Sequence, residues 1–409
     1  MSEPEDLSCC RKDFPMLTKT MHGKPLIYLD SAATAHKPLA VIDSLDGFYR
    51  DHYATVLRAI YELANFANNA YQQARVKVQQ FINAPVPEEI VFTRSTTDAI
   101  NIVAYSYGKA FVRPGDTVMI TEMEHHSNLV PWQILCEDRG AKLIVAPFDD
   151  AGNLLLDRFE ALIKEYKPKI IAVTHVSNVL GTLNPIKQLA SIAHAHGAHI
   201  LVDGAQSISH LPVDVQDLDV DFYAFSGHKL YGPNGVGILY GKADLLNEMP
   251  PAQGGGSMVE KVTFEKTTYN VLPWKFEAGT MMLAEIISLG AAIDYLQQYT
   301  MPKIHAWEQY LISYAMERIQ EVDGLTVIGN PKKRESVISF TVEGVHPLDI
   351  GSMLDLKGIA IRTGHNCAQT LLQHYNLTTT ARISFGIYNT PQEIDFFVDS
   401  LQATLAMLR

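Results

Sequence analysis

The most informative segment of this chain reads Asp221-Phe-Tyr-Ala-Phe-Ser-Gly-His-Lys-Leu-Tyr-Gly-Pro-Asn-Gly235. It begins as a short apolar and aromatic strand and breaks at Ser226 before a turn rich in glycine and proline. A lysine amine attacks carbonyl groups only when it is unprotonated, and burial beside cationic groups lowers its pKa. Ser226 and His228 suit a phosphate group near the amine of Lys229. A lysine beside a phosphate site is typical of an imine with pyridoxal phosphate; the alternative is a solvated lysine on a surface loop.

The composition indicates a globular protein with more than one domain. The chain has 409 residues, of which 47% are hydrophobic and 19% charged, and this length exceeds one simple core. A formal net charge of −12 without a Lys/Arg-rich run argues against nucleic acid or membrane partners. The acidic N-terminus and the lack of a long apolar run predict no signal peptide and no membrane span. Four scattered cysteines predict a reducing, cytoplasmic location.

Short β-branched runs alternate with amphipathic stretches between about residues 89 and 240. The expected strands are Thr117–Thr121, Lys142–Ala146, Lys169–Thr174, His199–Val202, Phe222–Phe225 and Gly237–Tyr240. The expected helices are Asp98–Ala110, Asn128–Glu137, Leu156–Glu165 and Pro185–Ala195. This alternation predicts an α/β fold, with a mostly parallel sheet covered on both faces and a site beyond the carboxyl ends of its strands.

The pattern changes after the glycine-rich segment Gly254–Gly256. A long helical stretch is expected from about Leu283 to Ile319. The later elements are short and mixed: strands at Leu325–Ile328, Ser336–Val342 and Ile359–Arg362, and helices beginning at Pro347 and Thr390. We therefore expect a smaller α+β domain joined to the large one by a long helix.

Polar side chains suited to a cofactor follow several of the expected strands. The hydroxyls of Thr96 and Thr97 lie where a strand ends and a helix begins, which is an anion site or a plain helix cap. His125 could stack on a pyridine ring. The alternative is that His125 and His126 are ligands of a zinc ion. Adjacent histidines point different ways, so we expect no metal. Another expected strand ends at Thr174. The side-chain amide of Asn178, four residues later, could hydrogen-bond a cofactor ring or a substrate carboxylate.

A carboxylate and an amide follow the strand that ends at Val202. Buried carboxylates need a partner, and the protonated nitrogen of a pyridine ring would serve Asp203 well. Gln206, three residues later, could hydrogen-bond a ring hydroxyl. The alternative is that Asp203 merely caps the next helix.

A second reactive group lies in the expected smaller domain, in Arg362-Thr-Gly-His-Asn-Cys-Ala368. Free cysteines are more often small buried hydrophobes than nucleophiles. Here Gly364 and its neighbours predict an exposed loop, where the thiol of Cys367 is accessible. Arg362 can hold an anion, and Arg382 suits a bidentate grip on a substrate carboxylate.

Eight segments together resemble the group II (SufS/CsdA-type) cysteine desulfurases, within the class-V aminotransferase family of pyridoxal phosphate enzymes. The similarity runs in order over nearly the whole chain. The segments are Tyr28–Ala33, Glu124–Asn128, Thr174–Thr182, Val202–Gln206, Phe225–Pro233, Gly254–Met258, Phe276–Thr280 and Arg362–Ala368.

The resemblance implies a fold-type I architecture, with a large domain built on a seven-stranded, mostly parallel sheet and a smaller C-terminal α+β domain. The implied divisions are an N-terminal segment (residues 1–25), a cofactor-binding domain (26–290) and a small domain with the Cys367 loop (291–409). A homodimer is also implied, in which Thr280 reaches the phosphate of the other subunit.

The resemblance further implies a role for each candidate. Lys229 would bind the cofactor and move the α-proton, and Asp203 would pair with the ring nitrogen. His125 would stack on the ring and take part in catalysis, while Cys367 would accept the sulfur. The phosphate would be held by Thr96, Thr97, Ser226, His228 and Thr280, the ring oxygen by Gln206, and the substrate by Asn178, Arg362, Arg382 and Arg58.

The chain departs from the family pattern at two places. The family usually reads Val-His-Arg-Gly-x-His where this chain has Val56-Leu-Arg-Ala-Ile-Tyr61, and Ala-Gly-Thr-Pro where it has Ala278-Gly-Thr-Met281. Arg58 remains. Both departures are expected near the substrate entrance and the subunit contact, so they bear on substrate preference and turnover.

The implied activity is removal of sulfur from L-cysteine, giving L-alanine and a Cys367 persulfide. A SufE-like protein would take the sulfur for iron–sulfur cluster assembly. Two other enzymes of the same fold are alternatives, a selenocysteine lyase acting on L-selenocysteine and a cystine C–S lyase. A catalytically reduced scaffold for sulfur transfer is a third, against which the presence of Lys229, Asp203 and Cys367 argues.

Overall fold

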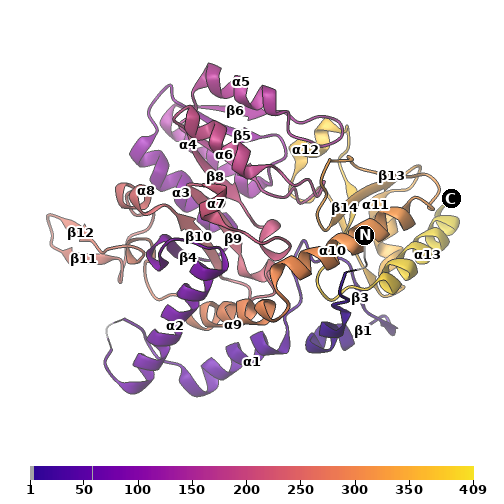
Figure 1. Ribbon diagram of the computed structural model, residues 1–409, viewed down its shortest axis with the longest axis horizontal. Coiled ribbons are helices and arrows are strands. Elements are labelled where there is room, and N and C mark those ends of the chain that lie inside the picture. Colours follow the sequence, from indigo (N-terminus) through magenta and orange to yellow (C-terminus); the bar gives the residue numbers. More distant parts are fainter. Residues whose placement is uncertain (1–3, 58) are drawn as a thin grey trace.

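A seven-stranded sheet forms the centre of the larger part of the molecule (Figure 1). The computed structural model describes residues 4–57 and 59–409. In order across the sheet, the strands are β4 (Ile90–Thr93), β10 (Gly237–Gly241), β9 (Phe222–Ser226), β8 (His199–Asp203), β7 (Ile170–Thr174), β5 (Thr117–Thr121) and β6 (Lys142–Ala146). Only β10 runs antiparallel to its neighbours in this sheet. The predicted α/β class and mostly parallel sheet are confirmed.

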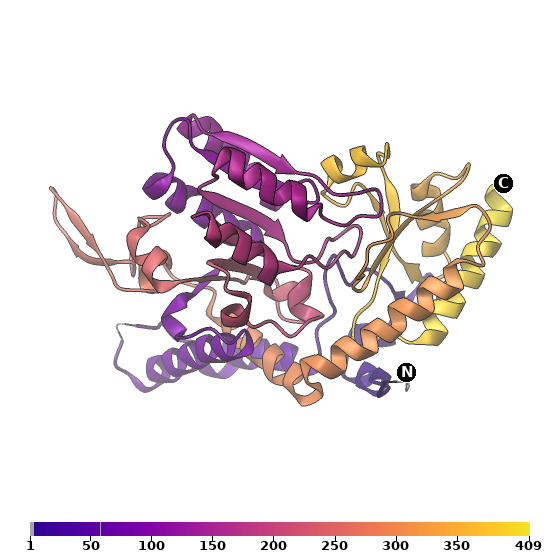
Figure 2. The ribbon, with the colours of Figure 1, turned by 45° about the horizontal axis from the view of Figure 1, so that its top comes forward.

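Helices cover both faces of this sheet because its strands are apolar on both sides (Figure 2). Along β7, Ile170 and Ala172 pack in the apolar cluster that includes helices α3 and α4, whereas Ile171 and Val173 pack in the cluster on the other face. The covering helices are α3 (Thr96–Phe111) and α4 (Val130–Arg139) on one face, and α2 (Glu62–Phe81), α5 (Leu156–Tyr166) and α6 (Ile186–Ala195) on the other.

All the predicted strands and helices of this region lie within two residues of their observed ends, and α4 is shifted by two residues at both ends. That helix begins at Val130 rather than Asn128. His126–Asn128 instead form a short 3₁₀ turn, because Asn128 uses its side chain to bond Glu124 and Trp132. Short further helices are α1 (Leu39–Gly47), α7 (Val215–Leu218) and α8 (Ala243–Glu248).

A second sheet of four antiparallel strands lies beside the carboxyl-terminal edge of the large sheet (Figure 2). Its strands are, in order, β13 (Leu325–Val327), β14 (Val337–Val342), β17 (Thr380–Ser384) and β16 (Arg362–Gly364). The helices packed around it are α10 (Met301–Ile319), α11 (Pro347–Asp355), α12 (Gln369–His374) and α13 (Pro391–Leu408). This confirms the smaller α+β unit.

The single strand predicted at Ile359–Arg362 is wrong. The chain forms β15 (Ile359–Ala360), which pairs in parallel with β3 (Ile27–Tyr28), and then crosses into the small sheet as β16. The N-terminal segment therefore enters the structure beside the small sheet. A further short pairing near the N-terminus joins β1 (Thr20–Met21) to β2 (Lys24–Pro25).

The long helix predicted from Leu283 to Ile319 is two helices. α9 (Leu283–Tyr299) ends where Thr300 adopts a left-handed φ of 63°, and α10 begins at Met301. Pro302 lies in the first turn of α10, and a proline there lacks the N–H that a continuous helix would need. α9 packs against α1 and α2, whereas α10 runs on toward the small sheet (Figure 2).

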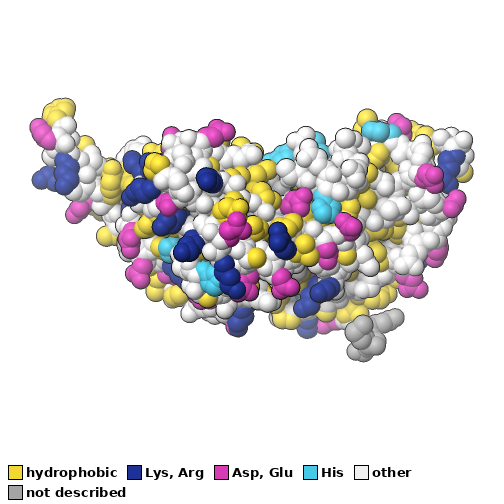
Figure 3. Space-filling model, turned by 90° about the horizontal axis from the view of Figure 1, so that it is seen from above, with side chains coloured by type: hydrophobic (Ala, Val, Ile, Leu, Met, Phe, Trp, Pro, Cys, Tyr) yellow, Lys and Arg dark blue, Asp and Glu magenta, His cyan; other side chains and the backbone are white. Residues whose placement is uncertain are grey.

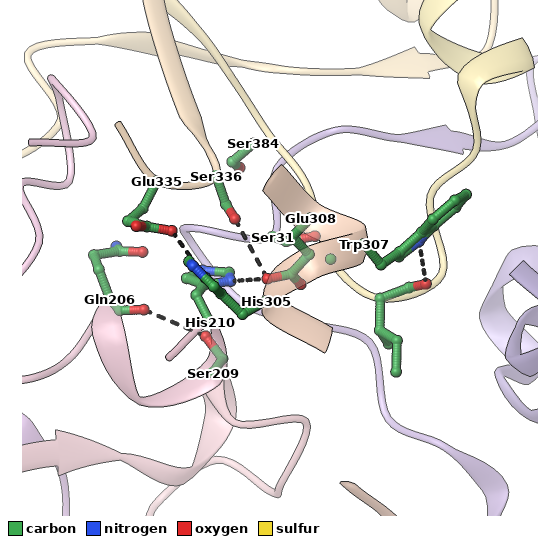
Figure 4. A network of polar contacts seen from close by, with 12 residues as sticks. Ser31, Gln206, Ser209, His210, His305, Trp307, Glu308, Glu335, Ser336 and Ser384 are labelled. Atoms are coloured by element: carbon green, nitrogen blue, oxygen red, sulfur yellow. Dashed lines mark hydrogen bonds and ion pairs between the residues drawn. The ribbon is translucent and has the colours of Figure 1, made fainter. Parts of the chain in front are cut away.

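A buried polar network joins the two parts at α10 (Figure 4). His210 Nδ1, in the loop after β8, lies 2.7 Å from Glu308 Oε2 on α10, and both side chains are at most 5% exposed. Ser336, directly before β14, donates to the same oxygen at 3.4 Å. Beside them His305 Nδ1 lies 3.4 Å from Glu335 Oε2. Because a buried polar group that loses its hydrogen-bond partner is costly, these contacts hold the two parts in one arrangement.

A hairpin of β11 (Val259–Val262) and β12 (Thr267–Tyr269) projects from the large part, with hydrophobic side chains toward its tip (Figure 3). Phe264, between the two strands, is fully exposed. Within the described part of the chain, none of the helices is long and apolar enough to cross a membrane.

Candidate active site

A cavity of about 420 Å³ lies between the carboxyl-terminal edge of the large sheet and the small sheet. It brings together most of the residues predicted from the sequence. These are Thr96, Thr97, His125, Asn178, Asp203, Gln206, Ser226, His228, Lys229, Arg362, Cys367 and Arg382. Thr280 is exposed and does not line this cavity, and Arg58 lies outside the described residues.

The large sheet places its share of these residues by topology. β4, β5, β7, β8 and β9 run parallel to one another, so their carboxyl ends meet at one edge. Each of these strands is followed by residues of the cavity: Thr96 and Thr97 after β4, His125 after β5, Asn178 after β7, Asp203 and Gln206 at the end of β8, and Ser226, His228 and Lys229 at the end of β9.

The Lys229 amine is poised to lose its proton. Burial lowers its pKa to about 8, the nearby Arg382 adds to this effect, and the carboxylate of Asp203 opposes it. At neutral pH a much larger fraction of this amine is neutral than for an exposed lysine. Lys229 can therefore act as a nucleophile toward an aldehyde and as a base.

Asp203 lines the cavity with a carboxylate, and His125 lines it with a flat, neutral ring. Asp203 is buried, which raises its pKa, and its Oδ1 accepts the amide N–H of Ala205 at 2.9 Å. Its Oδ2 has no hydrogen-bond partner among the described residues and can receive a ring N–H. Burial, with Lys229 nearby, lowers the pKa of His125 to about 3, so the imidazole is neutral, and its Nδ1 accepts the N–H of Ser127 at 3.0 Å.

Hydroxyl groups and amides cluster at the start of α3. Thr96 donates its backbone N–H to Ser226 Oγ at 2.7 Å, and the two hydroxyls also lie 2.7 Å apart. Thr97 Oγ1 lies 2.7 Å from Ser127 Oγ. His228 Nδ1 lies 3.2 Å from Thr34 Oγ1, and burial lowers the pKa of His228 to about 4. A helix N-terminus lined with hydroxyls is suited to a phosphate group.

Arg382 is buried on β17 and holds two other segments of the site. Its Nη1 donates to the carbonyl oxygen of Asn178 at 3.0 Å and its Nη2 to Asp30 Oδ1 at 3.1 Å. Its Nε has no partner within residues 4–57 and 59–409. Burial lowers the pKa of this guanidinium and raises that of Asp30. Arg382 thus has donor capacity left for a substrate carboxylate.

Cys367 lies on the wall contributed by the small part and is half-buried rather than fully exposed. Asn366 and Cys367 have left-handed φ angles of 51° and 53°, a conformation that is costly for residues other than glycine. Asn178 Nδ2 donates to the carbonyl oxygen of Asn366 at 2.7 Å, so the loop is bonded to the large part. The expectation of an exposed loop is therefore only partly met, because these contacts cover it.

The residues present fit pyridoxal phosphate. Lys229 can bind its aldehyde, the open oxygen of Asp203 can meet its ring nitrogen, and His125 can cover one ring face. Thr96, Thr97 and Ser226 form the anion site, and the cavity volume is in the range of cofactor and ligand sites.

Sequence reasoning missed several residues of the site. Asp30 is a carboxylate that follows the short strand β3, just as Asp203 stands at the end of a strand. It was missed because β3 is only two residues long and gives little strand pattern in the sequence. Glu124 is fully buried behind His125 and accepts hydrogen bonds from Thr121, Asn128 and the backbone of Thr174. Nothing local in the sequence indicates that it joins the ends of β5 and β7.

The chain matches the model of the family "Aminotransferase class-V" over residues 27–397. It is 50% identical over 393 residues to the "Cysteine desulfurase" of Pectobacterium atrosepticum, with 96% of each chain covered. It is 49% identical over 394 residues to the "Probable cysteine desulfurase" of Halalkalibacterium halodurans, covering 96% of this chain and 97% of the other.

A solved structure shows the same similarity in three dimensions. The crystal structure of the cysteine desulfurase CsdA from Escherichia coli superposes with a TM-score of 0.92 at 39% identity. The superposition covers 98% of this chain and 99% of the other.

Proposed function

This chain belongs to the class-V aminotransferase family and is a pyridoxal phosphate-dependent cysteine desulfurase; on this premise we propose that Lys229 moves the protons and Cys367 receives the sulfur. The observation that carries this proposal is that both residues line one cavity, although they come from different sheets. Proton transfer and sulfur transfer occur at opposite ends of L-cysteine, so two separate residues are needed.

The bound cofactor supplies an electron sink that weakens bonds at the α- and β-carbons of the amino acid. Lys229, with its pKa of about 8, is the base that takes the α-proton and later returns protons to the carbon skeleton. Asp203 holds the positive charge of the ring nitrogen. Arg382 and Asn178 orient the substrate carboxylate, with Arg362 at the exposed rim.

The sulfur transfer balances without a further reagent. The thiolate of Cys367 forms a bond to the substrate sulfur while the bond between that sulfur and the β-carbon breaks. The electron pair of the broken bond stays with the carbon skeleton, which is protonated and leaves as L-alanine. Cys367 is left as a persulfide.

A direct assay tests this assignment. Purified protein loaded with pyridoxal phosphate is mixed with L-cysteine, and alanine release and the mass of the peptide containing Cys367 are measured. We expect alanine and one added sulfur atom on Cys367. Alanine without added sulfur on Cys367, or a protein that does not hold the cofactor, would contradict the assignment.

We also propose a homodimer in which Thr280 completes the phosphate site of the partner subunit. Its support is that Thr280 is exposed and outside the cavity of its own chain. Large hydrophobic side chains are exposed in the segment leading into α2 and in its first turns, among them Tyr53, Ile60 and Phe66, and exposed apolar patches mark interaction sites. Size measurement of the holoenzyme in solution tests this.

The sulfur must leave Cys367 through another thiol. We propose a SufE-like acceptor, a role in iron–sulfur cluster assembly and a cytoplasmic location. The partial exposure of Cys367 and the free state of Cys9, Cys10 and Cys136 support these proposals.

We further propose that residues 1–25, 26–290 and 291–409 are the functional divisions of the chain.

A further inference from the structure

The Cys367 loop is attached to the large part through the segment that follows β5, and not only through Asn178. The backbone N–H of His126 donates to the carbonyl oxygen of Cys367 at 2.8 Å. The imidazole Nε2 of His126 accepts the backbone N–H of Gln369 at 3.2 Å. His126 therefore contacts the chain on both sides of Ala368, although 243 residues separate it from Gln369.

The bond to Gln369 replaces a cap that the local sequence lacks. The first N–H groups of a helix have no partner inside the helix. Gln369 is the first residue of α12, and Ala368 before it has no side chain that can accept a hydrogen bond. The imidazole of His126, which follows β5 of the large sheet, accepts a hydrogen bond from this N–H.

A second histidine completes the arrangement. His365 Nδ1 accepts the N–H of Cys367 at 3.0 Å, and the rings of His126 and His365 lie 5.6 Å apart. Burial, with His365 nearby, lowers the pKa of His126. The ring is therefore neutral at physiological pH, and its Nε2 remains an acceptor.

These contacts explain how Cys367 keeps an unfavourable backbone conformation. Two successive residues with left-handed φ angles are strained and persist only where the surroundings impose them. The carbonyl groups of both residues accept hydrogen bonds from the large part, one from Asn178 and one from His126. The imidazole bond to Gln369 adds a third point of attachment, directly after Ala368, and its loss would loosen the chain on that side of Cys367.

We propose that His126 is a positioning residue for sulfur transfer: its imidazole fixes the loop so that the Cys367 thiol faces the substrate. The inference rests on the proposed role of Cys367 as sulfur acceptor. It concerns His126 alone, and it is separate from the ring-covering role of its neighbour His125.

The test compares His126→Ala with His126→Gln in full-length protein loaded with pyridoxal phosphate. Glutamine places an amide oxygen near the position of Nε2 and can still accept the N–H of Gln369. His346→Ala is the matched control, because the exposed His346 also accepts a backbone N–H at a helix start, that of Leu348 in α11, and does not line the cavity.

Two measurements are made on each variant. The first is kcat and KM for alanine release from L-cysteine, and the second is the rate at which iodoacetamide alkylates Cys367, followed by peptide mass. For His126→Ala we expect kcat to fall roughly tenfold, the effect of one lost hydrogen bond to a backbone group, while KM stays within about twofold. We expect Cys367 to be alkylated several times faster. His126→Gln and His346→Ala should match the wild type within about twofold.

Absorbance of the bound cofactor and the denaturation midpoint show that each variant is folded. The inference is overturned if His126→Ala alkylates and turns over like the wild type, or if His126→Gln is as impaired as His126→Ala. A wild type that releases no alanine would overturn the proposed function instead, and the alkylation rates would still decide whether His126 holds the loop.

Discussion

Arg382 Nη2 lies 3.1 Å from Asp30 Oδ1, and this contact joins β17 of the small sheet to the segment behind β3, 352 residues away in the chain. The side chains are 4% and 16% exposed. The pair orients the guanidinium that we assign to the substrate carboxylate, so it should matter for both stability and binding.

Replacing Asp30 by asparagine should destabilise the protein. Breaking a fully buried ion pair costs about 3–5 kcal/mol; because Asp30 keeps some contact with solvent, we expect a loss of about 2 kcal/mol in the free energy of unfolding. Denaturant titration measures this. Asp46→Asn is the control, since Asp46 pairs with Arg50 where both side chains are more than half exposed, and it should change stability by less than about 0.5 kcal/mol. Equal effects would contradict the argument.

Replacing Arg382 by lysine should weaken substrate binding more than turnover. A lysine amine cannot reach Asn178, Asp30 and a substrate carboxylate in one planar arrangement. We expect KM for L-cysteine to rise at least tenfold, about 1.4 kcal/mol, with a smaller change in kcat. Steady-state kinetics at saturating cofactor provide the measurement, and an unchanged KM would remove Arg382 from the substrate site.

Capture of the cofactor aldehyde should depend on pH through Lys229. Its pKa is lowered to about 8, so the neutral amine should decrease about tenfold for each pH unit below 8 and level off above it. The rate at which apoprotein gains the absorbance of bound pyridoxal phosphate should follow this curve. Lys229→Ala should show neither this absorbance nor activity. A midpoint near the ordinary lysine pKa of 10.5 would show that the amine is not buried as described.

Replacing Cys367 by alanine should separate cofactor binding from sulfur transfer. The variant should keep the absorbance of bound pyridoxal phosphate, because Cys367 belongs to the opposite wall of the cavity, but should form no persulfide from L-cysteine. Cleavage of L-selenocysteine depends less on an acceptor thiol and should persist. If L-cysteine were cleaved at the wild-type rate, the sulfur would not pass through Cys367.

The departures from the family pattern lie away from the catalytic cavity of this chain. Leu57 and Tyr61 are exposed before α2, and Met281 is partly buried before α9. None of the three lines the cavity. In the proposed homodimer, these residues would act on substrate preference through the subunit contact. Substituting the family residues at these positions and comparing L-cysteine with L-selenocysteine addresses this.

The sequence alone determined those features that depend on neighbours along the chain. Alternating apolar runs predicted the sheet, and a polar residue directly after a strand predicted Asp203, His125 and Lys229, because parallel strands end at one edge. The prediction of one helix from Leu283 to Ile319 was wrong. The apolar periodicity of the sequence continues across Thr300, but the helical backbone is interrupted there.

Tertiary structure alone decided which distant groups meet. The partnership of Arg382 with Asp30, the hydrogen bonds from His126 and Asn178 to the Cys367 loop, and the Glu308 network between the two parts join residues far apart in the chain. No local pattern encodes such pairs, because a side chain's partner depends on how whole elements pack. Lys229 could therefore be proposed from the sequence as the reactive amine, whereas the position of the Cys367 thiol on the same cavity follows only from the docking of one sheet against another.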